Sequence, residues 1–259
     1  MNPGAALVTG GAHRLGQAMC LALAELGWDV AVHYASSKTA AEDLVTRLRA
    51  RGVKAAALHA DLLDENATSR LVALASAALD QPLTMLVNNA SIFEYDTIRS
   101  ATLTSWNRHI ASNLRAPFVL TQEFAKQVPK FVGEREHEAT GLIVNMVDQR
   151  VRKLTPEFMT YTLAKMGLWA LTQTTAQALA PDIRVNAIGP GPTLQGARQT
   201  DEHFAKQRRA TILKRGANAA EIVTALRFIV ESPGVTGQLI CVDGGQHLAW
   251  LTPDVSGVE

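Results

Sequence analysis

Short apolar segments alternate with longer amphipathic segments along almost the whole chain of 259 residues. The short segments have the length of strands, whereas the longer ones have helical spacing, and several of them end at a glycine. The expected strands cover residues 5–10, 29–34, 55–62, 84–90, 141–147, 183–191 and 237–245. The expected helices cover residues 15–27, 39–52, 66–79, 104–128 and 156–180. This alternation predicts one doubly wound α/β domain over 1–259, with a parallel seven-stranded sheet and helices on both faces.

Two polar segments interrupt the alternation. Residues 130–141 read KFVGEREHEATG, which predicts a surface loop. Residues 192–221 are polar and basic and fall between the last two expected strands. Ligands of such sheets bind beyond the carboxyl ends of the strands. The second segment is therefore either a substrate lid or a solvated helical excursion.

The composition is that of an ordinary globular protein, with 47% hydrophobic and 19% charged residues. A net charge of +1 indicates no nucleic-acid partner and no membrane surface. Cys20 and Cys241 belong to no Cys/His cluster, so we expect no metal site and two buried free thiols. The sequence has neither a signal-peptide pattern nor an apolar stretch long enough to span a membrane, which predicts a cytoplasmic protein.

A glycine-rich turn joins the first expected strand to the first expected helix. It reads TGGAHRLG from Thr9 to Gly16. Glycines let the backbone approach a pyrophosphate, and the N-terminus of the next helix offers N–H groups and a positive dipole end. A plain tight turn also favours glycine, but this position after the first strand indicates a dinucleotide-binding Rossmann domain.

The end of the second expected strand indicates which nicotinamide cofactor binds. NAD-binding folds usually place an acidic residue there for the ribose 2′-hydroxyl. Here the strand ends in HYASSK, and the polar groups nearby belong to His33, Ser36, Ser37, Lys38 and Arg14. Such donors and positive charges attract a 2′-phosphate, so we expect NADPH/NADP+; the alternative is that these are ordinary turn residues.

Tyr161 and Lys165 form a Tyr-x-x-x-Lys pair in the expected helix 156–180. Residues four apart share one face of a helix. A phenol has a pKa of about 10, and a nearby ammonium group should lower that pKa. The pair therefore predicts a proton donor and acceptor that works near neutral pH. The motif is common by itself, and its position behind a nucleotide-binding turn favours the catalytic interpretation.

Taken together, these motifs resemble the short-chain dehydrogenase/reductase family over nearly the whole sequence. The family's Thr-Gly-x-x-x-Gly-x-Gly turn is matched except that Arg14 replaces the middle glycine. The family's further motifs follow in order as ADL at 60–62, NNAS at 88–91, PG at 190–191 and DGG at 243–245. The resemblance implies a catalytic set of Asn113, Asp148, Tyr161 and Lys165. It implies cofactor contacts from Gly10, Arg14, Leu15, Gly16, His33, Tyr34, Ser36, Ser37, Asp61, Leu62, Asn89, Ala90, Ser91, Lys165, Pro190 and Gly191.

Asp148 stands thirteen residues before Tyr161, where the wider family has a serine. An ionised carboxylate cannot donate a hydrogen bond to a ketone and would repel a developing alkoxide. A C=N substrate differs, because its nitrogen must gain a proton that a carboxylic acid can supply, directly or through Tyr161. A carboxylate can also accept hydrogen bonds from the ring N–H and amino groups of a pterin. Alternatively, Asp148 is a solvated loop residue and the activity is lost or changed.

Arg14, Phe93 and Asp148 resemble the pattern of pteridine reductases and of bacterial dihydromonapterin reductases, also called alternative dihydrofolate reductases. That subgroup has Arg-Leu-Gly at the turn, His-Tyr-x-x-Ser after the second strand and Asn-Asn-Ala-Ser-x-Phe after the fourth. The resemblance implies hydride transfer from NADPH to a pterin or folate ring, with Tyr161 and Asp148 handling the proton. It implies substrate contacts from Arg14, Ser91, Phe93, Asp148 and Tyr161. Phe93 would sandwich the flat ring against the nicotinamide.

Thr193 comes earlier after Pro190-Gly191 than in the family's usual Pro-Gly-x-x-x-Thr, so the contacts of the segment 192–221 differ from the family pattern. Two alternatives stay open. One is a carbonyl reductase, such as a 3-oxoacyl thioester reductase, although Asp148 counts against it. The other is a catalytically silent NADP(H)-binding regulator, although the intact catalytic set counts against that. The resemblance also implies a homotetramer.

Overall fold

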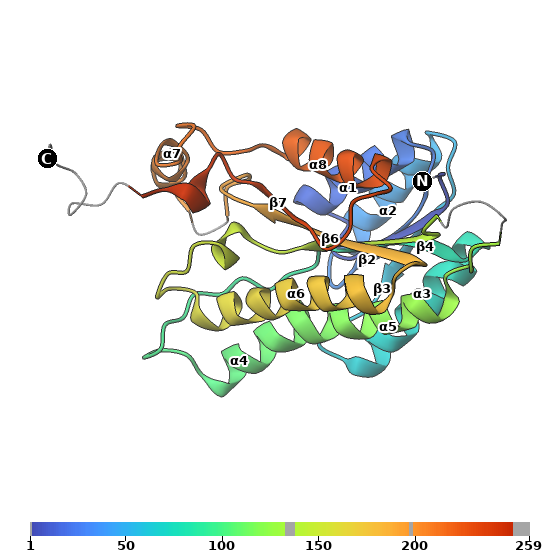
Figure 1. Ribbon diagram of the computed structural model, residues 1–259, viewed down its shortest axis with the longest axis horizontal. Coiled ribbons are helices and arrows are strands. Elements are labelled where there is room, and N and C mark those ends of the chain that lie inside the picture. The colour runs from blue at the N-terminus through green and yellow to red at the C-terminus, as the bar shows by residue number, and fades with distance from the viewer. Residues whose placement is uncertain (1, 133–137, 197–198, 251–259) are drawn as a thin grey trace, which may run out of the picture.

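The computed structural model describes residues 2–132, 138–196 and 199–250, and its centre is a seven-stranded sheet (Figure 1). The strands are β1 Ala5–Val8, β2 Asp29–Tyr34, β3 Ala55–His59, β4 Leu83–Asn88, β5 Gly141–Met146, β6 Ile183–Pro190 and β7 Leu239–Val242. Their order is β3-β2-β1-β4-β5-β6-β7, and every neighbouring pair is parallel. The predicted parallel α/β sheet is therefore confirmed.

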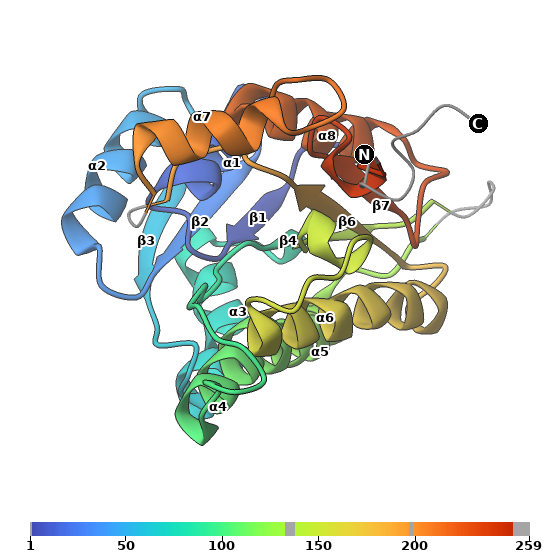
Figure 2. The same cartoon turned by 90° about the vertical axis from the view of Figure 1, so that its left-hand side faces the viewer.

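Helices cover both faces of the sheet, as Figures 1 and 2 show. The helices are α1 Arg14–Glu25, α2 Lys38–Arg49, α3 Glu65–Leu79, α4 Leu103–Ile110, α5 Ala116–Gln127, α6 Met159–Ala178, α7 Asp201–Arg209 and α8 Ala219–Glu231. Helices α1, α2 and α8 pack on one face, and α3, α5 and α6 pack on the other.

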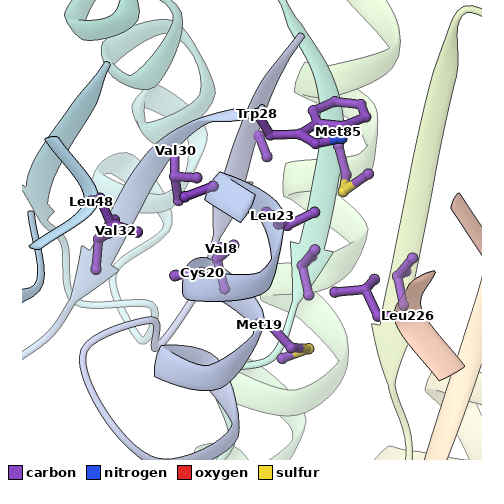
Figure 3. Packing of buried hydrophobic residues seen from close by; sticks show 14 of the residues in the cluster. Val8, Met19, Cys20, Leu23, Trp28, Val30, Val32, Leu48, Met85 and Leu226 are labelled. Atoms are coloured by element: carbon purple, nitrogen blue, oxygen red, sulfur yellow. The ribbon is translucent and has the colours of Figure 1, made fainter. Parts of the chain in front are cut away.

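The strands are rich in apolar residues, because both faces of the central strands are buried. In β1, Ala6 and Val8 belong to the core under α1, α2 and α8, whereas Ala5 and Leu7 belong to the core under α3 and α5. Figure 3 shows side chains of the first core, where Trp28 and Leu226 belong to the same cluster as the strand residues Val8 and Val30. Burying such a side chain stabilises the fold by about 1.5–3 kcal/mol, so the two layers hold the strand ends in place.

The strand order places a topological switch between β1 and β4. The chain leaves β1 towards β2 on one side, and β4 pairs with β1 on the other side. In open parallel sheets, the connections diverge at such a point and leave a crevice beyond the carboxyl ends of the strands. The glycine-rich turn after β1 and the NNAS segment after β4 therefore meet at this crevice.

Several elements differ from the sequence-based expectation. The single helix predicted over 104–128 is α4 and α5, joined by a π-helical turn at Ala111–Arg115. Helix α6 begins only at Met159, because Phe158 before it has a left-handed backbone with φ 54°. Helix α8 lies where the pattern predicted no element. Cys20 is buried, but Cys241 is only partly buried.

The predicted loop 130–141 contains residues 133–137, which lie outside the described residues; the described parts at 131–132 and 138–140 have no helix or strand. The segment 192–221 begins with a loop, continues as α7 and ends in the start of α8, and residues 197–198 lie outside the described part. None of the α7 side chains is buried, which fits a solvated helix. The loop before α7 borders the cavity below, so the lid stays a prediction. Within the ranges that the structure describes, no helix is long and apolar enough to cross a membrane.

Truncation of a core leucine on α3 should destabilise the fold, whereas truncation of an exposed leucine on the same helix should not. Leu71 is 0% exposed and Leu74 is 51% exposed. We expect Leu71→Ala to lower the free energy of unfolding by about 2–5 kcal/mol, because it leaves a cavity under the sheet. Leu74→Ala should change it by less than about 1 kcal/mol. Urea unfolding monitored by circular dichroism measures both, and equal losses would contradict this core assignment.

Candidate active site

A cavity of about 660 Å³ opens at the carboxyl ends of the central strands. It brings together most of the residues that the motifs singled out, although they come from distant parts of the chain. Its wall contains Gly10, Arg14, Leu15, Gly16, His33, Asp61, Leu62, Asn89, Ala90, Ser91, Phe93, Asp148, Tyr161, Lys165, Pro190 and Gly191. The predicted cofactor and substrate contacts of these residues stay predictions, but their convergence on one cavity supports them.

The glycine-rich turn has a shape that side chains would block. Gly10 has φ +59°, and a Cβ atom on Gly16 would come within 2.2 Å of the Gly10 carbonyl oxygen. His13 precedes α1, and its side chain makes no hydrogen bond that caps the helix. The first N–H groups of α1 are therefore not taken by the His13 side chain. A tight turn with such N–H groups at a helix start suits a phosphate group.

Arg14 adopts a left-handed backbone conformation, with φ 53°, at the position where the family has glycine. Its guanidinium group donates to the carbonyl oxygens of Leu194 at 2.9 Å and of Gln195 at 2.7 Å. The turn after β1 is thereby bound to the segment after β6. Arg14 thus borders the cavity and at the same time holds the segment that contains Leu194 and Gln195.

Asn89 joins the loop after β4 to the turn after β1. Its Nδ2 atom donates to the carbonyl oxygens of Thr9 at 2.8 Å and of Gly10 at 3.1 Å. The Thr9 hydroxyl in turn accepts from the backbone N–H groups of Asn89 and Ala90. These bonds fix the cavity wall, so the side chain of Asn89 acts mainly on the protein backbone.

His33 has a different role from the one its position suggested. Its Nδ1 accepts from the Gly10 N–H at 3.0 Å, so its Nε2–H donates to the Ala60 carbonyl, also at 3.0 Å. Burial lowers the pKa of His33 to about 4. The ring is therefore neutral with both nitrogens engaged. The expectation that it offers charge to a 2′-phosphate is wrong, and it instead supports the turn at Gly10.

The other residues predicted to lie near the adenosine end are partly outside the cavity. The wall includes Ala35 but does not include Tyr34, Ser36 or Ser37, which lie beside it at the end of β2. Asp61 lines the cavity, and its carboxylate accepts from the Leu63 N–H at 2.9 Å. The described end of β2 carries no acidic side chain, which keeps the prediction of NADP over NAD.

Asp148, Tyr161 and Lys165 lie at the floor of the cavity. The Tyr161 hydroxyl donates to Asp148 Oδ2 at 2.9 Å, and Asp148 Oδ1 accepts from the Arg150 N–H at 2.8 Å. Lys165 Nζ donates to the Met146 carbonyl at 2.7 Å and lies 5.7 Å from the centre of the Tyr161 ring. Asp148 is therefore not a solvated loop residue, because it accepts the hydrogen bond of the Tyr161 hydroxyl directly.

Poor hydration shifts the pKa of Asp148, of Tyr161 and of Lys165. Burial raises the pKa of the Asp148 carboxyl above its usual value, although its hydrogen bonds act the other way. Burial and the adjacent Asp148 raise the pKa of the Tyr161 hydroxyl well above 10. The expectation that Lys165 lowers the pKa of Tyr161 is therefore wrong for the protein alone. Burial is the largest cause and Asp148 the next, so Tyr161 keeps its proton and points it at Asp148.

Phe93 forms an aromatic surface at the cavity mouth. It is 45% exposed, which excludes the alternative that it is a core residue. Its ring stacks on Phe158 with centroids 4.4 Å apart and planes 7° apart, and it meets the Tyr161 ring edge-on at 4.7 Å. The Arg150 guanidinium lies 4.8 Å from the centroid of Phe158. A flat aromatic group is thereby held beside Tyr161.

Asn113 lies in the π-helical turn between α4 and α5 and is fully buried. Its Nδ2 donates to the Ile92 carbonyl, and its Oδ1 accepts from the Ile92 N–H, both at 2.8 Å. Its side chain therefore secures the loop that carries Ser91 and Phe93. A direct catalytic contact of Asn113 stays a prediction.

A second cavity of about 810 Å³ adjoins the first and shares Arg14, Phe93 and Asp148 with it. Its wall also includes Gln149, Arg150, Phe158, Leu194 and Phe204. The predicted substrate residues Arg14, Phe93 and Asp148 and the segment 192–221 border this cavity. Gln149, Arg150 and Phe158 were not predicted from the sequence, although they lie between Asp148 and Tyr161 in it. In the described part of the chain, no cluster of His, Cys, Asp and Glu side chains could hold a metal ion.

A family comparison accounts for this arrangement. Residues 4–206 match the family model described as short chain dehydrogenase. The chain belongs to the short-chain dehydrogenase family. This result agrees with the resemblance inferred from the turn, the NNAS segment and the Tyr/Lys pair.

Curated relatives in this family include 3-oxoacyl-[acyl-carrier-protein] reductases. The Staphylococcus aureus enzyme FabG is 30% identical over 248 residues, which cover 94% of this chain and 98% of the relative. The Synechocystis enzyme of the same description is 32% identical over 247 residues, covering 93% and 95%.

Two similar solved structures are those of FolM alternative dihydrofolate reductase 1 with NADP. The Brucella canis protein is 41% identical, with a TM-score of 0.89 and coverage of 99% of this chain and 98% of that one. The Brucella suis protein is 43% identical, with a TM-score of 0.90 and coverage of 97% and 98%.

The buried ammonium group should make stability depend on pH. Burial lowers the pKa of Lys165 to about 8, from 10.5. Between these values the unfolded chain binds more protons, so the contribution of Lys165 to the free energy of unfolding should increase as pH rises. The increase is at most about 1.4 kcal/mol per pH unit.

The measurement compares urea unfolding of wild type and Lys165→Met, without cofactor, at about pH 7.5, 8.5 and 9.5. We expect the free energy of wild type minus that of the variant to grow with pH. A difference that stays constant or shrinks would mean that Lys165 is not held in a poorly hydrated site.

Proposed function

We propose that this protein is an NADPH-dependent reductase of dihydropterins or dihydrofolate. The hydrogen bond from Tyr161 to Asp148, beside the exposed ring of Phe93, is the observation that carries the proposal. It combines a proton donor, a group that pairs with ring N–H and amino groups, and a stacking surface. The similarity of 41–43% to Brucella alternative dihydrofolate reductases supports it.

The residues around the first cavity suit NADP. The tight turn at Gly10 and Gly16 leaves room for a pyrophosphate, and the described end of β2 carries no carboxylate to repel a 2′-phosphate. The similar Brucella structures contain NADP. Bound NADPH supplies the hydride of the reaction.

The chain's own residues supply the proton. Reduction of a C=N bond adds a hydride to the carbon and a proton to the nitrogen. The Tyr161 hydroxyl keeps its proton at neutral pH and so can donate it, and Asp148, whose pKa is raised by burial, can pass a proton to Tyr161. Lys165 contributes positive charge nearby and holds the Met146 carbonyl.

The second cavity suits the substituent of a pterin ring. It begins at Phe93 and Asp148, where the ring would lie, and extends towards Phe204 and Gln207 on α7. A ring that stacks on Phe93 would therefore place its side chain between Arg150 and the segment after Gly191. A homotetramer stays a prediction that rests on the resemblance, and a cytoplasmic location stays a prediction that rests on the sequence pattern.

A 3-oxoacyl thioester reductase is the second candidate, because the relatives from Staphylococcus aureus and Synechocystis have that description. Tyr161 and Lys165 serve ketone reduction as well. Asp148 counts against it, since a carboxylate 2.9 Å from the phenol would repel the developing alkoxide.

The first test compares substrates with the wild type, Asp148→Ser and Asp148→Asn. We expect wild type to oxidise NADPH with 7,8-dihydropterins and dihydrofolate, and both variants to lose about 100-fold or more in kcat/KM, because the carboxyl group no longer assists protonation. Absorbance of NADPH measures the rate. Turnover of 3-oxoacyl thioesters alone, or faster ketone reduction in Asp148→Ser, would assign the second candidate instead.

Tyr161→Phe should abolish turnover and leave NADPH binding within about twofold of wild type, because only the donated proton is lost. Quenching of tryptophan fluorescence by NADPH gives the binding constant, and stopped assays with excess enzyme give the residual rate. If the variant retained turnover, the proton would have to come from Asp148 or water.

A further inference from the structure

Two buried side chains on one helical surface hold the backbone on either side of Phe93. Asn113 binds the N–H and the carbonyl of Ile92, as described above. His109 Nε2 accepts from the Glu94 N–H at 3.1 Å. His109 and Asn113 are both 0% exposed. Buried side chains therefore hold the backbone at Ile92 and at Glu94, directly before and after Phe93.

The hydrogen bonds of His109 define its tautomer. Since Nε2 accepts from a backbone N–H, the proton lies on Nδ1, which donates to the Thr160 hydroxyl at 2.7 Å. Burial lowers the pKa of His109, which keeps the ring neutral. The imidazole thus links the Phe93 loop to the residue directly before the catalytic tyrosine.

Thr160 continues this chain of hydrogen bonds to Asp96. Its hydroxyl donates to Asp96 Oδ2, and its backbone N–H donates to Asp96 Oδ1 at 3.1 Å. The Ser105 hydroxyl also donates to Asp96 Oδ2, at 3.1 Å. Asp96 is 2% exposed. Its carboxylate ends the network and accepts these hydrogen bonds from Thr160 and Ser105.

We propose that His109, Thr160 and Asp96 are positioning residues that hold Phe93 against Tyr161, and with them the aromatic surface on which a flat substrate ring stacks. The ring's identity rests on the proposed function; the positioning itself rests on the hydrogen bonds. Phe93 and Tyr161 come from different elements, and their rings meet edge-on at 4.7 Å. A small displacement of a positioned group can cost a large factor in rate.

Helix α6 offers a matched control. Thr160 and Thr162 are both buried, at 2% and 6% exposed. The Thr160 hydroxyl joins two partners in the network, whereas the Thr162 hydroxyl has none among the residues that the structure describes. Valine has the shape of threonine without the hydroxyl. Thr160→Val therefore removes the link from His109 to Asp96 through the hydroxyl, and Thr162→Val makes the same change to the helix without touching this link.

The kinetic test uses Thr160→Val, Thr160→Ser and Thr162→Val with 7,8-dihydropterin as the substrate. We expect Thr160→Val to raise KM for the dihydropterin and to lower kcat/KM by about tenfold or more, with the dissociation constant of NADPH unchanged. Thr160→Ser, which keeps a hydroxyl, should restore most of the loss. Thr162→Val should match wild type.

The outcomes separate positioning from general damage. Wild-type kinetics in Thr160→Val would overturn the proposal. So would equal losses of NADPH affinity and turnover that Thr160→Ser does not restore, since those would indicate a misfolded variant.

A second readout needs no turnover. Amide hydrogen exchange at Glu94 should accelerate in Thr160→Val and stay unchanged in Thr162→Val, because the His109 acceptor moves only in the first. If wild type reduced no dihydropterin, the proposed function would fail while this exchange pattern still supported the positioning network. Equal exchange in both variants would overturn the network itself.

Discussion

All strands of the sheet run in one direction, and the site depends on this single constraint. Parallel strands end at the same edge, so the turn after β1, the loop after β4, the segment after β5 and the Pro-Gly after β6 all reach one crevice. Their distances in sequence are large, yet Asn89, Thr9 and Gly10 bind one another directly. The two apolar layers keep these strand ends fixed, because burial on both faces resists any shift of a strand.

Low hydration at this edge decides the chemistry of the polar groups. Lys165 is 2% exposed and Tyr161 is 5% exposed, so each charged form loses much of its hydration. Asp148 is then the main charged group that raises the pKa of Tyr161, because it accepts the phenolic hydrogen bond directly, whereas Lys165 faces the Met146 carbonyl. A serine at this position would lack that charge. The carboxyl group therefore raises the pKa of Tyr161 beyond what burial alone does.

The fold and much of the site could be predicted from local patterns. Strand and helix lengths predicted the sheet, and the motifs predicted which residues line the cavity, because most of the motifs sit directly after a strand. Features that depend on contacts between distant segments could not be predicted. The π-helical turn at Ala111–Arg115 leaves no mark in the spacing of apolar residues. Burial among distant segments lowers the pKa of His33 and, together with Asp148, raises the pKa of Tyr161, and the hydrogen-bond partners Gly10 and Asp148 lie 23 and 13 positions away in the chain.

Arg14 shows how one substitution can couple two parts of this edge. A left-handed backbone costs a non-glycine residue about 1–2 kcal/mol, which explains the glycine that the family prefers there. The guanidinium group offsets this cost through two charge-assisted hydrogen bonds to Leu194 and Gln195. A glycine would leave the turn relaxed but disconnected from the segment after β6. The strained arginine thus binds the glycine-rich turn to the border of the second cavity. The shape of that cavity therefore depends on a residue that also lines the first cavity.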